Sequence, residues 1–145
     1  MNLFGMLEAS GGAMTAERWR AEIVSANMAN AETTRTPQGG AYRRQLVVFR
    51  ARPMPRFSLM LAGLRQNSPQ PAVEVERVVP DTSPLPRRFE PGHPDADGQG
   101  YVTYPNVNPV MEMTDLLSAV RAYQLNASAV QAAKNMIQQS LQLLS

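Results

Sequence analysis

The single histidine of the chain, His93, lies in a run of acidic and turn-forming residues from Glu90 to Gly100. A catalytic triad requires a base that is oriented by an acid and placed beside a nucleophile, and no nucleophile stands in such a setting here. A structural zinc site requires about four nitrogen or sulfur ligands, which one histidine without any cysteine cannot supply. The pattern therefore favours a tight turn held by aspartate and glycine.

The same run does not form a calcium loop either. Such a loop takes acids at alternating positions, glycine at the sixth and glutamate at the twelfth. Counted from Asp95, the sixth residue is Gly100, but the fifth is Gln99 and the twelfth is Asn106. Gly39–Gly40 also lacks the Lys-Ser or Lys-Thr that completes a phosphate-binding loop. The sequence thus predicts no catalytic residue, no metal site, no cofactor and no small-molecule substrate, and we expect no enzyme.

Basic residues concentrate in the middle of the chain, although the formal net charge is only +2. Between Thr33 and Val73 there is no acid, and the basic residues are Arg35, Arg43, Arg44, Arg50, Arg52, Arg56 and Arg65. One interpretation is contact with a polyanion; the other is a solvated or interface face. Proteins that bind nucleic acid usually carry a recognisable module or a stronger net charge, so no nucleic-acid partner is expected. A small basic binding module for nucleic acid or an anionic surface remains the alternative function.

Residues 109–145 are predicted to form one long helix, because they contain neither glycine nor proline after Pro109. Proline suits the first helical turn, where its missing N–H would have no partner. Residues spaced by seven occupy the a and d positions of successive heptads. The a line is Met113, Val120, Ala127, Lys134 and Leu141, and the d line is Leu116, Tyr123, Val130, Ile137 and Leu144. This regularity favours a seam that meets other helices.

The N-terminal residues are also predicted to form a helix, because apolar residues recur at steps of three, four and seven: Leu3, Leu7, Met14, Ala21, Val24 and Met28. Gly11–Gly12 should break or bend this helix, because glycine weakens helix interiors by about 1 kcal/mol each. A continuous helix is therefore expected from about Ala13 to Ala31. Asn27 and Asn30 are expected to hydrogen-bond at its end, in an interface or turn role.

The middle of the chain holds eleven of the twelve prolines, from Pro37 to Pro105. Strands are predicted in Tyr42–Arg50 and Ala72–Val79, which are rich in β-forming residues, and turns after Asp81. The predicted fold is mainly α with a small β-containing insert. It comprises an N-terminal axial helix in 1–34, a Pro-rich β/turn segment in 35–108 with an Arg-rich loop at about 51–71, and a C-terminal coiled-coil helix in 109–145. The two long helices are expected to form an antiparallel coiled-coil pair.

No stretch of the chain approaches the roughly 20 apolar residues that span a bilayer. Residues 1–16 also lack a basic region followed by a clean apolar run, because Glu8 interrupts them. We therefore expect a chain that does not span a membrane and carries no cleavable signal peptide.

Two long runs of the sequence carry recognisable motifs. The first is the Asn-rich Ala26–Thr34, which leads into the run GGAYRRQ at Gly39–Gln45. The second comprises PGHPDAD at Pro91–Asp97 and GYVTYPNVN at Gly100–Asn108, and continues through Glu112–Met113, Arg121–Asn126 and Ala133–Met136. Over about residues 9–50 and 72–145 the chain is similar to the bacterial flagellar basal-body proximal rod protein family. Gly12 stands where the family pattern would place a larger apolar residue.

The resemblance implies a structural subunit of the flagellar basal-body rod. Such a subunit assembles helically through its terminal helices into the drive-shaft tube that supports motility and export. The resemblance also implies type III export without a cleavable signal peptide and a place in the periplasmic rod. Its partners would be copies of itself, other rod proteins, and basal-body ring and export-gate components. The expected assembly interface comprises Met113, Leu116, Val120, Tyr123, Ala127, Val130, Ile137, Leu141, Leu144, Met14, Ala21, Val24, Asn27, Met28 and Asn30.

Overall fold

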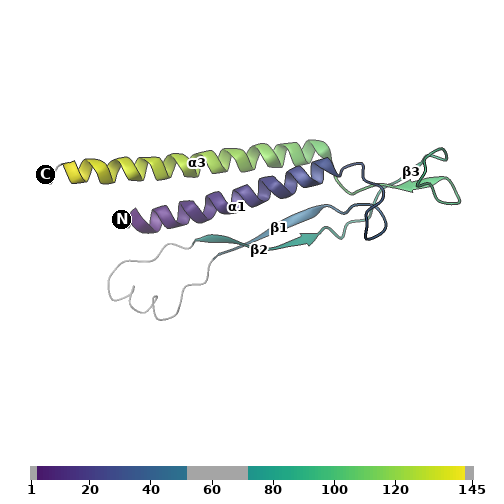
Figure 1. Ribbon diagram of the computed structural model, residues 1–145, viewed down its shortest axis with the longest axis horizontal. Helices are drawn as coiled ribbons and strands as arrows, with labels where there is room; N and C mark the ends of the chain where they lie inside the picture. Colours follow the sequence, from purple (N-terminus) through teal and green to yellow (C-terminus); the bar gives the residue numbers. More distant parts are fainter. Residues whose placement is uncertain (1–2, 52–71, 143–145) are drawn as a thin grey trace. The chain divides into compact units, whose positions relative to one another are not determined.

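The computed structural model describes residues 3–51 and 72–142 of the chain (Figure 1). Its elements are α1 (Leu3–Ala29), β1 (Gln45–Ala51), β2 (Val73–Pro80), β3 (Arg87–Phe89), β4 (Tyr101–Thr103) and α3 (Pro109–Gln142). The predicted class, mainly helical with a small β-containing insert, is confirmed. Leu144 and the predicted Arg-rich loop from residue 52 onward lie outside the described residues. None of the described helices is both long and apolar enough to cross a membrane.

The chain divides into two compact units, which are described separately. Unit 1 takes its described residues from 1–19, 49–76 and 119–145, and unit 2 consists of 20–48 and 77–118. Each unit therefore combines part of α1, part of α3 and part of the insert between them.

The predicted break in the first helix at Gly11–Gly12 is wrong, because α1 runs without interruption from Leu3 to Ala29. The reason lies in the packing of unit 1. A Cβ on Gly12 would lie 2.8 Å from the Val73 carbonyl oxygen and 3.7 Å from the Ala72 Cβ, so only glycine allows this approach of α1 to the start of β2. Ala16, one turn later, is 3% exposed. Tertiary packing thus holds α1 together where helix propensity alone would not.

The two adjacent glycines are expected to respond in opposite ways to alanine. Among the described residues nothing lies within 4 Å of a Cβ on Gly11, so Gly11→Ala should raise the free energy of unfolding by about 1 kcal/mol through helix propensity alone. Gly12→Ala should instead lower it by about 1 kcal/mol, because overpacking outweighs the same gain. Urea unfolding of the two variants measures the difference. Equal stabilisation by both would show that α1 does not pack closely on β2.

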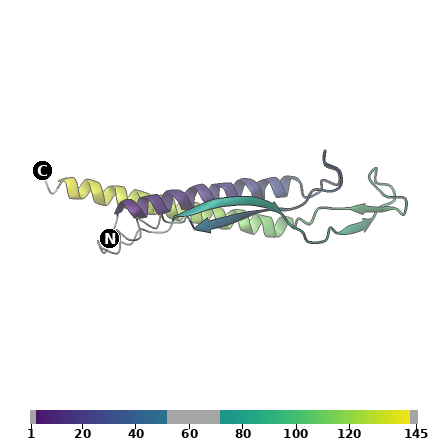
Figure 2. The same ribbon diagram turned by 90° about the horizontal axis from the view of Figure 1, so that it is seen from below.

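The two predicted strands are confirmed, as β1 and β2 pair in a two-stranded sheet. The Asp81 amide, just after β2, donates a 2.7 Å hydrogen bond to the Arg44 carbonyl, just before β1. The end of one strand therefore meets the start of the other, and the pair is antiparallel, as the opposed arrows in Figure 2 show.

A second two-stranded sheet in unit 2 was not predicted from the sequence, which indicated only turns after Asp81. Here β3 pairs antiparallel with β4, and Arg88 lies opposite Val102, which is fully buried. The connection between the strands is held by Asp97, whose Oδ1 accepts hydrogen bonds of 2.9 Å from the Gln99 and Tyr101 amides. These hydrogen bonds hold the pKa of the Asp97 carboxyl below its ordinary value, and the bond from the Tyr101 amide has the largest effect. The turn held by aspartate and glycine is thus confirmed.

The helix α3 begins at Pro109, as predicted. Asn108 caps it, because its Oδ1 accepts hydrogen bonds from the Val110 amide at 3.0 Å and the Met111 amide at 3.4 Å. Such a side chain satisfies N–H groups that have no partner inside the helix. Farther along, a line of residues spaced by multiples of seven is buried: Glu112 (0% exposed), Ala119 (1%) and Ala133 (0%). The side of α3 that packs within the chain is therefore offset by one residue from the predicted a line.

Candidate functional site

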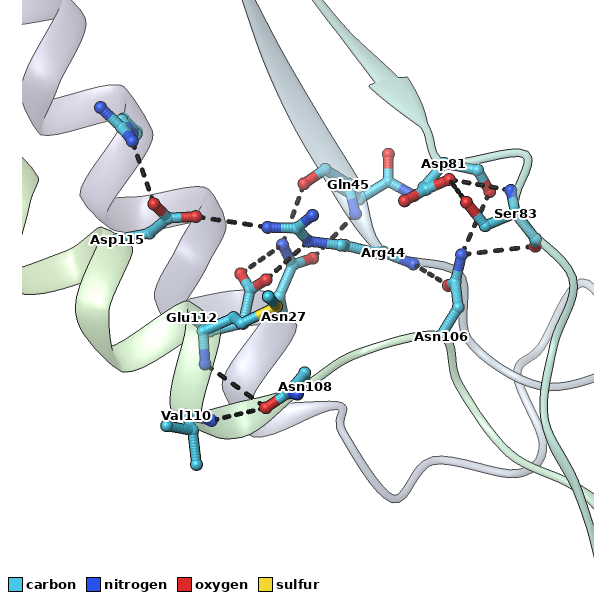
Figure 3. A network of polar contacts seen from close by, with 12 residues as sticks. Asn27, Arg44, Gln45, Asp81, Ser83, Asn106, Asn108, Val110, Glu112 and Asp115 are labelled. Atoms are coloured by element: carbon cyan, nitrogen blue, oxygen red, sulfur yellow. Dashed lines mark hydrogen bonds and ion pairs between the residues drawn. The ribbon is translucent and has the colours of Figure 1, made fainter.

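Asn27, near the end of α1, lies at the centre of a buried polar network in unit 2 (Figure 3). Its side chain is 1% exposed. Its Nδ2 donates to the Gln45 carbonyl at 2.9 Å and to Glu112 Oε2 at 3.0 Å. Its Oδ1 accepts from the Gln45 amide and the Tyr42 hydroxyl, both at 2.9 Å. A primary amide has two N–H donors and two acceptor lone pairs, and all of them are used here.

Glu112, in the first turn of α3, is the buried acid of this network and is 0% exposed. Its Oε1 accepts a 2.6 Å hydrogen bond from Arg44 Nε, while Oε2 is held by Asn27. Arg44 also reaches Asp115 Oδ2 through Nη2 at 3.3 Å, and Arg20 contacts the other oxygen of Asp115 at 3.2 Å. A carboxylate removed from water is tolerated only with such pairing and hydrogen bonding.

The backbone of Arg44 is fixed by two further segments of unit 2. Its amide donates to Asn106 Oδ1 at 2.9 Å, and its carbonyl accepts from the Asp81 amide at 2.7 Å. Figure 3 shows these contacts converging from α1, α3, the start of β1 and the segment before α3. The arrangement locks segments that are far apart in the sequence into one geometry.

Tyr42 is expected to make the network sensitive to high pH. Burial, and next the nearby Glu112 carboxylate, raise the pKa of the Tyr42 hydroxyl above its ordinary value. Because the folded chain holds this proton more tightly than the unfolded chain, the stabilisation is complete below about pH 10 and is lost as the pH rises further. We expect the free energy of unfolding to fall above pH 10, and to fall less steeply in Tyr42→Phe. Urea unfolding between pH 8 and pH 11 tests this, and identical slopes would contradict it.

The described arginines of the basic stretch are engaged within their own units. Arg44 is paired as above, and Arg43 donates to the Asp81 and Ser83 carbonyls at 3.2 and 3.3 Å. Arg35 lies 3.4 Å from Asp95, and Arg50 lies 2.8 Å from Glu74. Arg52, Arg56 and Arg65 lie outside the described residues. The described part of this stretch therefore serves the chain's own ion pairs and backbone contacts.

His93 has a structural setting. Its Nδ1 accepts a 3.1 Å hydrogen bond from the Asp95 amide, and its ring meets Tyr104 edge-on with centroids 6.4 Å apart. Across residues 3–51 and 72–142, no group of three or more histidine, cysteine or acidic residues is placed to hold a metal ion.

The predicted interface residues of α3 fall into two groups. Exposed side chains are Met113 (56%), Tyr123 (43%), Val120 (41%) and Leu141 (63%). Half-buried ones are Leu116, Ala127, Val130 and Ile137. In α1 and the residues that follow it, Met14, Ala21, Met28 and Asn30 are half-buried, whereas Val24 and Asn27 are buried. Contact of these residues with a neighbouring subunit stays a prediction.

Sequence reasoning missed two apolar residues on the same side of α3 as Met113 and Val120. Val110 is 75% exposed and Leu117 is 53% exposed. Residues three, seven and ten positions apart lie on one side of a helix, so Val110, Met113, Leu117 and Val120 form one line, here named the α3 stripe. Their spacing is visible in the sequence, but the strict seven-residue spacing of the heptad lines does not select Val110 and Leu117.

The chain matches two family models of flagellar rod proteins. Residues 7–35 match the model described as flagella basal body rod protein, and residues 99–143 match the C-terminal model of the flagellar basal body rod FlgEFG proteins. Both ends of the chain, which form α1 and α3, are therefore of the flagellar rod type.

Comparison with curated proteins shows which family of flagellar rod proteins the chain resembles. The chain is 37% identical to the flagellar basal-body rod protein FlgC of Borreliella burgdorferi and 36% identical to that of Bacillus subtilis, with 99% of both chains covered in each case. It is 34% identical to FlgC of Escherichia coli O6:H1, with 99% of this chain and 98% of that protein covered. The chain belongs to the FlgC family of flagellar basal-body rod proteins. It is a structural subunit of the basal-body rod and assembles with other rod proteins.

Proposed function

We propose that this subunit assembles helically, with copies of itself and with other rod proteins, by burying the α3 stripe against neighbouring subunits. The exposure of the stripe carries the proposal. Four large apolar side chains that are 41–75% exposed occupy one side of α3, while Glu112, Ala119 and Ala133 on another side are buried within the chain. Full burial of a Val, Leu or Met side chain contributes about 1.5–3 kcal/mol, so a partner on this face would stabilise both molecules.

The terminal helices are also proposed to pair as an antiparallel coiled coil. Support comes from unit 2, where Asn27 and Arg20 of α1 contact Glu112 and Asp115 of α3. Asn27, which follows Arg20 in α1, contacts Glu112, which precedes Asp115 in α3. This reversed order is the one that antiparallel helices require.

The assembled tube is proposed to be the drive shaft of the periplasmic rod, supporting motility and export. A subunit in that position would reach its place by type III export, without a cleavable signal peptide, and would meet ring and export-gate components. A contact that uses different surfaces on the two partners, and that does not close into a ring, generates a helical filament.

Charge introduced into the α3 stripe tests the proposal. In cells whose only copy of the gene carries Leu117→Asp, we expect at least a tenfold loss of rods and of swimming, because a carboxylate would be buried unpaired. The adjacent exposed Ser118 lies off the stripe, so Ser118→Asp is the matched control with the same added charge and should assemble far better. Normal rods in Leu117→Asp would reject the stripe as an assembly surface.

A further inference from the structure

Unit 1 contains an open groove of about 460 Å³ between α1 and β2. Residues that line it include Glu8, Gly11, Thr15 and Trp19 of α1 and Val73 and Glu74 of β2. Trp19 is 47% exposed and Val73 is 38% exposed, so two apolar side chains of the groove remain largely open to solvent. The groove is distinct from the polar network of unit 2 and is not used by it.

Gly11 in this groove has no explanation within the described part of the chain. Gly12 is needed for the close approach to Val73, but at Gly11 a Cβ would meet no described atom within 4 Å. A glycine at that position weakens the helix interior compared with any ordinary residue. The missing side chain at Gly11 leaves room on the groove surface for a side chain from another molecule.

The charges of the groove are complementary to those of α3. The ionisable residues that line the groove are the acids Glu8 and Glu74. Glu74 is paired with Arg50 at 2.8 Å, and the contact proposed below involves Glu8. The acids of α3, Glu112 and Asp115, are paired with Arg44, and the other charged residues of α3 are Arg121 and Lys134, both basic. Arg121 lies one turn after Leu117, so a cation accompanies the α3 stripe. Apolar contact flanked by opposite charges gives both burial and orientation.

We propose that this groove receives the α3 stripe of a second copy of the chain, with Leu117 over Gly11 and Arg121 towards Glu8. The inference rests on the proposed function, since it names the surface against which the stripe is buried. The two partners use different surfaces, α3 of one copy and the α1–β2 groove of the next, so the contact is of the head-to-tail kind that propagates along a filament.

Filling the groove separates its role in assembly from its role in folding. Gly11→Leu should leave the melting temperature of the purified chain unchanged or higher, because no described atom lies within 4 Å of its Cβ and leucine favours a helix more than glycine does, yet should reduce rods in cells at least tenfold. Gly11→Ala, the control, should preserve rods because a single methyl leaves most of the groove open. Normal rod numbers in Gly11→Leu would overturn the proposal.

Cross-linking tests the contact itself, because the chain contains no cysteine. Thr15→Cys and Leu117→Cys, carried on separate copies in one cell, should form a mixed disulfide at twice the 15.9 kDa chain mass after mild oxidation. Ser118→Cys in place of Leu117→Cys should form several-fold less. Cross-links of Leu117→Cys to other positions, without the mixed species, would overturn the groove while leaving the rod role intact. Failure of the proposed function would show instead as normal rods in Leu117→Asp, which would reject the α3 stripe as an assembly surface.

Discussion

Arg44→Met is expected to lower the free energy of unfolding by about 3 kcal/mol, because it leaves Glu112 buried without its cation. The Glu112 side chain is 1% exposed, whereas that of Arg44 is 24% exposed. Water near the guanidinium therefore offsets part of the loss, which places the effect at the lower end of the range for a broken buried ion pair. The measurement is urea unfolding of the full chain at neutral pH, followed by circular dichroism.

The double variant Arg44→Met/Glu112→Leu is the control for this prediction. Replacing both members of a buried pair by apolar residues often restores stability, because no charge is left unpaired. We expect the double variant to recover most of the loss. A double variant as unstable as Arg44→Met would show that packing of the arginine stem, or the Asn27 Nδ2 donor left without Glu112, rather than the buried charge accounts for the effect.

Asn27→Asp is expected to destabilise the chain by about 3 kcal/mol or more, although the two side chains have nearly the same shape. The new carboxylate would lie about where Nδ2 now donates to Glu112 Oε2 at 3.0 Å, so a favourable hydrogen bond becomes a contact between two buried like charges. The donor to the Gln45 carbonyl is lost as well. Thermal unfolding of the full chain measures the change.

Asn30→Asp is the matched control, since Asn30 makes only local contacts. Its Nδ2 donates to the Ala26 carbonyl at 2.9 Å, and its Oδ1 accepts from the Thr33 hydroxyl at 3.1 Å. We expect a loss of about 1 kcal/mol, as for an ordinary helix-end contact. Equal losses in the two variants would contradict a special role of Asn27 in the network.

The elements that depend on local pattern were predictable from the sequence. The stretch that begins with Pro109 and contains no glycine predicts α3. The runs rich in β-branched residues predict β1 and β2. The short pair β3 and β4 was missed because each strand has only three residues, and its pairing depends on the Asp97 turn and on the burial of Val102. The unbroken α1 was missed because its continuity depends on contact with β2, which is absent from any local window around Gly11–Gly12.

The polar network was partly visible in the sequence, but its role was not. Asn27, Arg44 and Glu112 all lie in the runs that resemble the rod family, and a helix-end role was expected for Asn27. The sequence does not predict that these residues contact one another, because they are 17 to 85 positions apart in the chain. Asn27, Arg44 and Glu112 connect the end of α1 and the start of α3 to the insert. Of these residues, Arg44 comes from the basic stretch.

The sequence predicts that the apolar face of α3 is a seam, and which of its residues contact another subunit stays a prediction. Strict sevens select residues such as Val130 and Ile137, which are half-buried within the chain. The side that remains open combines Met113 and Val120 with Val110 and Leu117. When a helix has two apolar sides, the sequence alone does not show which side packs within the chain and which stays exposed, because the fold decides this.

The most direct measurement of the central claim is the chemical accessibility of position 117 in assembled basal bodies. Because the chain has no cysteine, Leu117→Cys places a single thiol on the α3 stripe, and a maleimide reports whether that thiol is exposed. We expect rapid labelling of the purified subunit and at least tenfold slower labelling in intact basal bodies, with the rapid rate restored when these are dissociated. Labelling at the same rate in the intact and dissociated states would mean that the stripe stays open to solvent in the rod, and would contradict assembly through this face.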